Sequence, residues 1–181
     1  MSEPEKTAVL AREGFDEESF RAPKKGGWAE ARPVTYLREP WENVVFESER
    51  MAFGHSSDNP RSGNGCLRMT GNEQTRLTRS FPARSGEWLA GQVWCRGLIN
   101  PGTYVAMEMR FYNSKGQPLV GRETAVLHPA NYADWQLVTV AGRAPYGTVR
   151  VEVMLRAMSQ EAEETLDWDD FLLMKLKADE N

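Results

Sequence analysis

The sequence predicts an all-β protein, built as a sandwich or a barrel of antiparallel strands. Apolar and polar residues alternate with a period of two from about residue 64 onward, and Gly, Pro and Asn cluster between the alternating segments. No long stretch repeats its apolar residues with the helical period of about 3.6 residues. The 181 residues suit one domain of ordinary size with one substantial core.

Three segments show the strand pattern most clearly. Residues Tyr104–Tyr112 and residues 148–156 each place four apolar side chains on one side and mostly polar side chains on the other. The apolar members are Val105, Met107, Met109 and Phe111 in the first segment, and Val149, Val151, Val153 and Leu155 in the second. In a third segment, Leu89, Val93 and Cys95 alternate with Trp88, Gln92 and Trp94. Such alternation predicts half-buried antiparallel strands.

Shorter strands and turns complete the predicted pattern. Further strands are expected at residues 8–10, 66–70, 75–81, 135–140 and 167–175. Turn-forming residues separate the strands at 60–65, 100–102, 113–116 and 144–147. Gly116 is available for the positive φ of a hairpin loop. One turn of helix fits near residues 129–133 or 48–53.

The N-terminal third is less regular than the rest. Residues 22–61 are rich in loop-forming residues but contain five aromatic side chains, which favour burial or a binding surface over disorder. They are Trp28, Tyr36, Trp41, Phe46 and Phe53. We expect long loops here, with one or two strands laid over the sandwich. The predicted organisation is a flexible N-terminus at 1–7, a single β-sandwich domain at 8–176 and a C-terminal tail at 177–181.

Composition and charge narrow the range of functions. The formal net charge is −4 and no block of Lys and Arg stands out in the sequence, which argues against nucleic-acid binding. No run of about 18 apolar residues is present to cross a membrane. Residues 1–15 lack the apolar core of a signal peptide. The protein is therefore either cytosolic or had a leader removed, and the sequence leaves both open.

The two cysteines, Cys66 and Cys95, both fall within expected strands. They form either one disulfide or two free, partly buried thiols. His55 and His128 are isolated in the sequence, and no Cys-x-x-Cys spacing occurs. A zinc site is therefore not expected.

Seven short motifs follow one another in the order of a known family. They are GFDE at 14–17, SGNGCLRM at 62–69, GEW at 86–88, RFY at 110–112, WQLV at 135–138, AP at 144–145 with VRV at 149–151, and DWDDFL at 167–172. This order resembles the galactose-binding-like β-sandwich carbohydrate-binding modules, notably families four, nine, sixteen and twenty-two. Cys66 stands where the family usually has Ser. The long segment 22–61 departs from the pattern and is placed to remodel or cover the usual binding loops.

The resemblance implies a two-sheet antiparallel jelly roll that binds a polysaccharide or an oligosaccharide without cleaving it. It further implies a secreted or cell-surface location and, in the full-length protein, a neighbouring catalytic domain such as a glycoside hydrolase. Neither nucleic acid nor a membrane is an expected partner. The alternative is a structural or protein-interaction β-sandwich with no sugar ligand.

The candidate binding surface is the polar side of the long strands. If these strands neighbour one another in one sheet, their outward side chains combine flat aromatic rings with charged and amide hydrogen-bonding groups. Sugar rings stack on such aromatics, and their hydroxyls bind such polar groups. The predicted ligand-binding residues are Trp88, Gln92, Trp94, Tyr104, Glu108, Arg110, Tyr112, Arg150 and Glu152. Trp94 and Tyr112 are the expected stacking residues. The alternative is a solvated face with cross-strand ion pairs, such as Glu108 with Arg150 or Glu152 with Arg110.

The resemblance also implies a structural calcium ion. In the resembled fold, the segment after the first strand and the last strand come together and often hold Ca²⁺, which binds carboxylates and carbonyls. Asp16 and Asp169 are the preferred ligands, and the loop at residues 62–65 is placed to add carbonyl oxygens. The alternative is an Asx turn or a capped strand end without a metal.

Catalysis is not expected from the sequence. Glu164, Asp167 and Asp169 superficially resemble the carboxylate-rich strand of some jelly-roll glycosidases, but they cluster on the closing strand and away from the aromatic face. No Ser-His-Asp arrangement emerges, since neither histidine has a partner suggested by the sequence.

Overall fold

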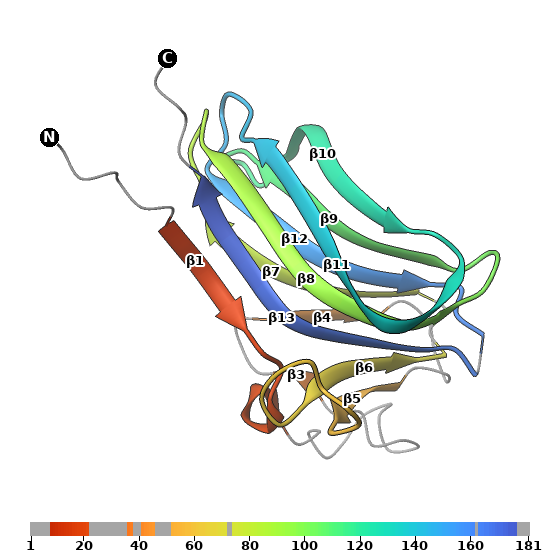
Figure 1. Cartoon of the computed structure of the whole chain (residues 1–181). Coiled ribbons are helices and arrows are strands. Elements are labelled where there is room, and N and C mark those ends of the chain that lie inside the picture. The colour runs from red at the N-terminus through yellow and green to blue at the C-terminus, as the bar shows by residue number, and fades with distance from the viewer. Residues whose placement is uncertain are drawn as a thin grey trace, which may run out of the picture.

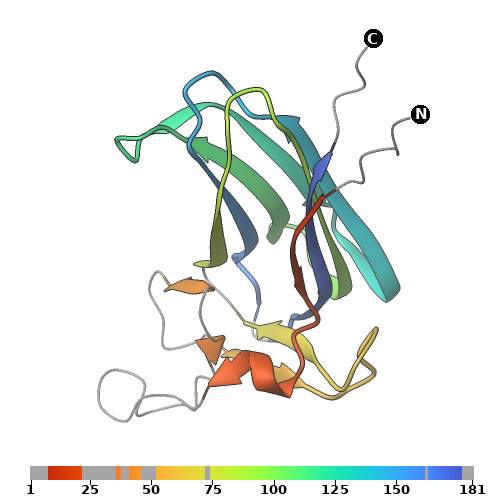
Figure 2. The ribbon, with the colours of Figure 1, turned by 90° about the vertical axis from the view of Figure 1, so that its left-hand side faces the viewer.

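The computed structural model describes residues 8–21, 36–37, 41–45, 52–71, 74–161 and 163–176. Within these residues, a six-stranded and a five-stranded antiparallel sheet pack face to face, and a small two-stranded sheet lies beside them (Figure 1). The two layers are seen edge-on in Figure 2. This architecture confirms the predicted two-sheet β-sandwich and decides against a barrel.

The six-stranded sheet is organised around β13. Its order is β11-β8-β13-β6-β5, and β1 pairs with the remaining part of β13. The strands are β1 (Ala8–Glu13), β5 (Ala52–Ser56), β6 (Cys66–Thr70), β8 (Trp88–Ile99), β11 (Ala130–Arg143) and β13 (Thr165–Leu176). β8 lies along one side of β13, and β6 and β1 share the other side.

The five-stranded sheet has the order β10-β9-β12-β7-β4. Its strands are β4 (Glu42–Val45), β7 (Gln74–Pro82), β9 (Tyr104–Tyr112), β10 (Pro118–Leu127) and β12 (Arg150–Met158). A short 3₁₀ helix, η1 (Glu17–Ser19), precedes the small sheet of β2 (Phe20–Arg21) and β3 (Tyr36–Leu37). β9 and β12 pair along their whole lengths and form the middle of the five-stranded sheet.

The sequence alternation locates most strands closely. β6 and β9 have the predicted bounds, and six other strands overlap a predicted segment. The helical turn expected near residues 129–133 is wrong, because β11 begins at Ala130. The alternation does not reveal β10, because Gly121 has a φ of 112° and lies where the register with β9 shifts.

The core lies between the two sheets and is filled by alternate residues of the paired strands. β9 and β12 contribute the apolar residues that the sequence alternation predicts for the core, apart from Val149, which is 48% exposed and precedes β12. β13 adds Leu166, Trp168, Phe171 and Leu173, all fully buried. Each fully buried large apolar side chain stabilises the fold by about 1.5–3 kcal/mol.

A bulge in β13 changes which residues face the core. Trp168 and Phe171 are both fully buried although they are three positions apart, which a regular strand with period two does not allow. The register between β13 and β8 shifts between Asp169 and Leu172, and Asp170 has a φ of 50°. Asp can adopt this left-handed conformation at low cost compared with bulkier residues. The bulge coincides with the place where β13 changes partner from β6 to β1.

The N-terminal aromatic residues are only partly described. Trp41 is 3% exposed, and its ring centroid lies 5.7 Å from that of Phe15 and 5.1 Å from that of Phe171. Tyr36 and Phe53 have their backbones in β3 and β5. Trp28 and Phe46 lie outside the described residues, as do the proposed N-terminal and C-terminal tails. The predicted domain bounds therefore stay a prediction.

Cys66 and Cys95 are free, buried thiols, which settles the choice between a disulfide and two thiols. Burial raises the pKa of Cys66 to about 12 and raises the pKa of Cys95 as well. Both thiols therefore stay protonated and weakly reactive at neutral pH. Among the described residues, no helix has the length and apolar character needed to cross a membrane.

A row of three charged residues ties the centre of the six-stranded sheet together on its outward face. Asp167 on β13 is opposite Arg68 on β6 and Arg96 on β8. Its carboxylate accepts hydrogen bonds from Arg68 Nε at 2.7 Å and from Arg96 Nη2 at 2.7 Å. The carboxylate side chain is 5% exposed, so this is a nearly buried ion triad.

We expect Asp167→Ala to lower the free energy of unfolding by about 2 to 4 kcal/mol, since two partly buried guanidinium groups lose their counter-charge. Asp58→Ala is the matched control: its carboxylate also binds Arg68, at 3.1 Å, but is 73% exposed. The control should cost less than about 1 kcal/mol. Chemical denaturation followed by tryptophan fluorescence measures both. Equal losses in the two variants would contradict the structural role of the triad.

Candidate functional site

The predicted binding residues lie on two opposite faces of the sandwich. β8 belongs to the six-stranded sheet, whereas β9 and β12 belong to the five-stranded sheet. Trp88, Gln92 and Trp94 are therefore separated from the β9 and β12 residues by the whole core. The expectation of a single shared face is wrong, because the chain crosses from one sheet to the other at the turn between β8 and β9. Alternation fixes the faces within a strand but does not fix the sheet to which it belongs.

Trp94 lies on the outward face of the six-stranded sheet and is covered by a loop. The guanidinium carbon of Arg61 lies 3.9 Å from the centroid of the Trp94 ring. The backbone N–H groups of Arg61 and Ser62 donate to Asp169 Oδ2 at 2.8 and 3.1 Å, which anchors the loop over the sheet. Arg61 also pairs with Asp170. This stacking leaves Trp94 less accessible to a sugar ring than its position in the sequence suggests.

The outward face of the five-stranded sheet gathers the other predicted residues and adds three arginines. We call it the β9–β12 face. It is formed by Tyr104, Glu108, Arg110 and Tyr112 of β9, Arg150, Glu152 and Arg156 of β12, Arg76 of β7 and Arg122 of β10. The register makes these residues neighbours: Arg110 is opposite Glu152 on β12 and opposite Arg122 on β10. The predicted residues of β9 and β12 thus share one face.

Glu108 is at the centre of this face and is fully buried, although it points away from the core. Arg156 Nη1 donates to its Oε1 at 2.9 Å, and the Tyr104 hydroxyl donates to the same oxygen at 3.1 Å. Its Oε2 has guanidinium nitrogens of Arg122 and Arg110 at 3.7 and 3.8 Å and no hydrogen bond among the described residues. Long side chains therefore rise around a recessed carboxylate. The suggested pair of Glu108 with Arg150 is not formed.

The two tyrosines mark the ends of the β9–β12 face. The Arg150 guanidinium lies 4.4 Å from the centroid of the Tyr112 ring and binds Glu152 at 3.1 Å. Burial raises the pKa of both tyrosine hydroxyls, and the neighbouring carboxylates of Glu108 and Glu152 raise it further. Both tyrosines are therefore neutral at physiological pH. Their half-buried rings offer flat surfaces with a hydrogen-bonding edge.

Sequence reasoning placed Arg156 on this face without assigning it to the site, and it missed Arg76 and Arg122. Arg122 is on β10, whose alternation the irregularity at Gly121 obscures. Arg76 is on β7, which was predicted as a strand, but its pairing with β12 is a non-local property. The sequence after Gly121 offers no clear signal, because the charged Glu123 is opposite the core residue Met109 whereas the apolar Val126 is 46% exposed.

The segments of the two predicted calcium ligands do come together, around the loop at residues 61–64. Asp169 Oδ2 accepts the two loop N–H groups, and its Oδ1 accepts the N–H of Asp170 at 2.7 Å. Asp16 Oδ1 accepts the N–H of Asn64 at 2.7 Å. Burial raises the pKa of Asp169 to about 6, against the opposing effect of these donors. Both carboxylates thus bind donors, as the Asx-turn alternative describes.

The described residues do not fit a calcium site in this arrangement. Among them, no group of three or more His, Cys, Asp or Glu side chains is placed to hold a metal ion. N–H groups instead face three of the four carboxylate oxygens of Asp16 and Asp169. The calcium hypothesis itself stays a prediction, which the experiment at the end of this section tests.

The other carboxylates considered for catalysis have structural partners. Glu164 is fully buried, and it accepts hydrogen bonds from the Thr103 hydroxyl and from the backbone N–H groups of Asn100 and Glu161. Asp167 is held in the ion triad with Arg68 and Arg96. These groups therefore join loops and strands.

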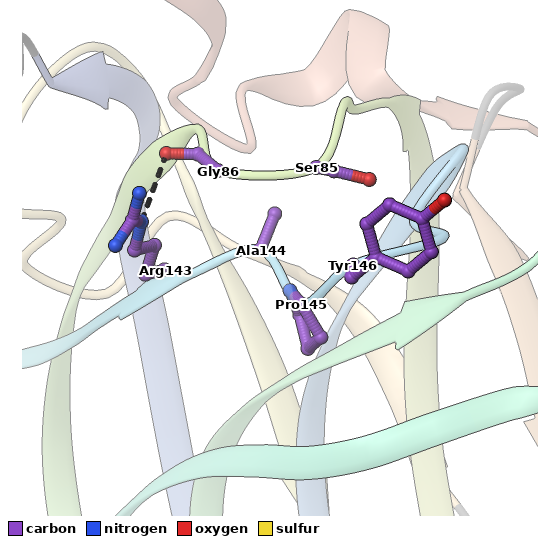
Figure 3. A pocket seen from close by; sticks show the side chains of 6 residues that line it. All are labelled: Ser85, Gly86, Arg143, Ala144, Pro145 and Tyr146. Carbon is purple, nitrogen blue, oxygen red and sulfur yellow. Dashed lines mark hydrogen bonds between the residues drawn. The ribbon is translucent and has the colours of Figure 1, made fainter.

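A shallow depression of about 420 Å³ lies at the end of the sandwich where the β7–β8 and β11–β12 loops meet (Figure 3). Its lining residues are Ser85, Gly86, Arg143, Ala144, Pro145 and Tyr146. The Ala144 carbonyl accepts the N–H of Gly86 at 2.8 Å, and Arg143 Nε donates to the Gly86 carbonyl. Tyr146 is 96% exposed. The depression offers one aromatic ring but, unlike the β9–β12 face, no cluster of buried polar side chains.

The fold matches solved structures of carbohydrate-binding modules. The family 22 module CBM22-1, a xylan-binding domain of Paenibacillus barcinonensis Xyn10C, gives a TM-score of 0.58 at 11% identity, over 95% of this chain and 97% of that one. The module TmCBM61, solved with β-1,4-galactotriose, gives a TM-score of 0.53 at 16% identity, over 76% and 90% of the two chains. At these identities the likeness shows the fold, and it confirms the resemblance seen in the sequence.

A third match concerns a larger protein. The enzymatically active domain of tailspike protein 4 from bacteriophage CBA120 gives a TM-score of 0.63 at 11% identity over 76% of this chain. This chain spans about a fifth of that protein's length, since the match covers 20% of it. No protein-family model matches the sequence, and neither does any curated protein.

The calcium hypothesis predicts that a chelator lowers the melting temperature and that added Ca²⁺ restores it, since an ion bound only to the folded state stabilises it. Asp169→Ala should remove this response, whereas Asp134→Ala, which changes an exposed carboxylate on β11, should keep it. Differential scanning calorimetry with and without chelator measures the shift. An unchanged melting temperature in the original protein would rule out a structural calcium ion.

Proposed function

We propose that this domain binds a polysaccharide or an oligosaccharide through the β9–β12 face, without cleaving it. The observation that carries the proposal is the buried Glu108 on an outward sheet face, surrounded by arginines and flanked by two tyrosines. A carboxylate without access to water is costly unless it is paired. On a merely solvated face, Glu108 would extend into water instead.

The face has the size and the chemistry for a chain of sugars. Tyr104 and Tyr112 are eight residues apart on β9, about 26 Å at the usual rise of a strand. Each tyrosine ring provides a surface for the C–H face of a sugar. The Arg150 guanidinium also contacts the Tyr112 ring, but it comes from the neighbouring strand β12 and not from a loop anchored over the sheet, as at Trp94. Between the rings, the guanidinium groups of Arg110 and Arg156 present several N–H donors to hydroxyl oxygens. The arrangement fits an extended ligand along β9 better than a single buried sugar.

Glu108 positions these donors. Its Oε1 fixes Arg156 and Tyr104, and its Oε2 lies within ion-pair distance of Arg110 and Arg122. Holding long side chains in place before the ligand arrives reduces the entropy lost on binding. The affinity should nevertheless be modest, because an open sheet face buries only part of each sugar.

The comparisons support this class of function. Two of the matching modules carry names that describe binding to xylan or a complex with a galactotriose, and both are similar to this chain over most of its length. Glu164 and Asp167 accept hydrogen bonds that hold loops and strands together. A binding role, which needs no catalytic carboxylate, fits this arrangement. In a longer protein, the domain would hold a catalytic domain near its polysaccharide substrate.

We expect Tyr112→Ala to weaken glycan binding about ten-fold, because it removes a stacking surface at one end of the face. Affinity electrophoresis through gels that contain plant, algal or bacterial polysaccharides identifies a ligand, and calorimetry then measures its affinity. Tyr146→Ala is the matched control, since this exposed tyrosine lies at the loop depression and away from the face. It should leave the affinity unchanged.

Trp94→Ala separates the two faces of the sandwich. Under the proposal, it should not change the affinity, because Trp94 lies on the six-stranded sheet beneath Arg61. Loss of binding in Trp94→Ala but not in Tyr112→Ala would move the site to the six-stranded sheet. If no polysaccharide delays the unaltered protein, the alternative of a structural or protein-interaction sandwich replaces the proposal.

A further inference from the structure

The β9–β12 face carries an excess of positive charge that the rest of the protein does not share. Its described side chains include five arginines, at positions 76, 110, 122, 150 and 156, and two glutamates, Glu108 and Glu152. The whole chain has a formal net charge of −4. The described side chains of the face therefore sum to a formal charge of +3, five positive minus two negative, in a chain whose net charge is negative.

Two arginines of the face are directly opposite each other on neighbouring strands. Arg122 on β10 is the register partner of Arg110 on β9. Like charges in such positions repel and destabilise a sheet. A neutral sugar ligand gives no reason to keep such a pair, whereas a negatively charged ligand would relieve the repulsion when it binds.

Glu108 compensates only part of this charge. It makes a hydrogen-bonded pair with Arg156, but Arg110 and Arg122 are 3.8 and 3.7 Å from its Oε2, beyond hydrogen-bond distance. The Arg122 side chain is 48% exposed and that of Arg150 is 39% exposed. Both side chains are therefore partly accessible to a ligand.

The geometry favours a carboxylate group on the ligand. Each planar guanidinium matches a carboxylate through two parallel hydrogen bonds. Arg110, which is paired with Arg122, is two residues from Tyr112 on β9, or about 7 Å. An acidic sugar can therefore place its carboxylate at this arginine pair while a neighbouring ring of the same chain stacks on the tyrosine.

From this arrangement, which rests on the proposed glycan-binding function of the same face, we infer that the ligand is an acidic polysaccharide whose negative charges are the carboxylates of uronic acid residues. Arg110 and Arg122 bind the carboxylate of one uronic acid residue. Tyr104 and Tyr112 stack on the sugar rings at the two ends.

The test compares each polysaccharide with its own carboxyl-reduced form, in which the uronic acids have become the neutral sugars. Polygalacturonate and a glucuronic acid-substituted xylan serve as probes, with dextran sulfate as a charged polymer that has no carboxylates. We expect the native acidic polymer to bind at least about ten-fold more tightly than its reduced form, because charge-assisted hydrogen bonds are lost on reduction. Its affinity should also fall as salt is added.

Two variants assign this preference to the face. Arg110→Gln and Arg122→Gln should each reduce the difference between the native and the reduced polymer. Arg143→Gln is the matched control, because Arg143 is exposed and lines the loop depression at the end of the sandwich. It should leave the difference unchanged. A difference that survives in both face variants would overturn the assignment to Arg110 and Arg122.

The remaining outcomes separate this inference from the proposed function. Equal binding of the native and the reduced polymer would overturn the preference for carboxylates but leave glycan binding intact. Tighter binding of dextran sulfate than of both acidic polymers would replace it with attraction to polyanions in general. Absence of binding to every acidic and neutral polysaccharide would overturn the proposed function together with the inference.

Discussion

The bulge at Asp169 and Asp170 in β13 is the constraint on which the rest of the arrangement depends. One extra residue there allows Trp168 and Phe171 to be buried on the same side of the strand, and it marks the change of partner from β6 to β1. The same extra residue leaves the Asp169 carboxylate on the outward side, where it accepts the N–H groups of the loop that carries Arg61. A single irregularity therefore fixes the core of the central strand and also holds a loop over the outward face of its sheet.

The consequence is an asymmetric sandwich. On the six-stranded sheet, Arg61 stacks on Trp94, so the loop covers an aromatic side chain that would otherwise be open to ligands. On the five-stranded sheet, β9 and β12 pair along their full lengths, and among the described residues no such loop covers them.

Both outward faces contain a buried carboxylate flanked by arginines, but the two carboxylates hold their arginines at different distances. Asp167 makes short contacts with both of its arginines, whereas Glu108 holds one closely and leaves two at longer distances. The first arrangement joins strands, and the second leaves donors for a ligand.

The alternation of polar and apolar residues predicted most strands and their two faces, but it predicted little about which strands pair in the same sheet. The alternation of Met107 and Met109 with Glu108 gave the strand and its two faces, because side-chain direction follows from a period of two. It could not show that β8 and β9, adjacent in sequence, belong to different sheets, since the pairing of strands is decided by contacts across the whole core. For that reason Trp94 and Tyr112 were placed together. Arg122 was missed for a different reason: an irregularity at Gly121 breaks the alternation of an edge strand. The motif order identified the architecture but carried no information about which face binds.

The likeness to carbohydrate-binding modules therefore settles less about the ligand than about the scaffold. At 11% to 16% identity, the matched structures share the path of the backbone, whereas a sugar is recognised by the side chains on one face. In this chain, those side chains include Arg110 and Arg122, which are directly opposite each other and share one carboxylate, Glu108, at 3.8 and 3.7 Å. One carboxylate compensates only part of the charge of these arginines, and an acidic ligand would compensate the rest. The chemistry of the ligand is thus to be sought in the charge of the β9–β12 face, because matches at 11% and 16% identity show the fold and not the side chains that recognise a sugar.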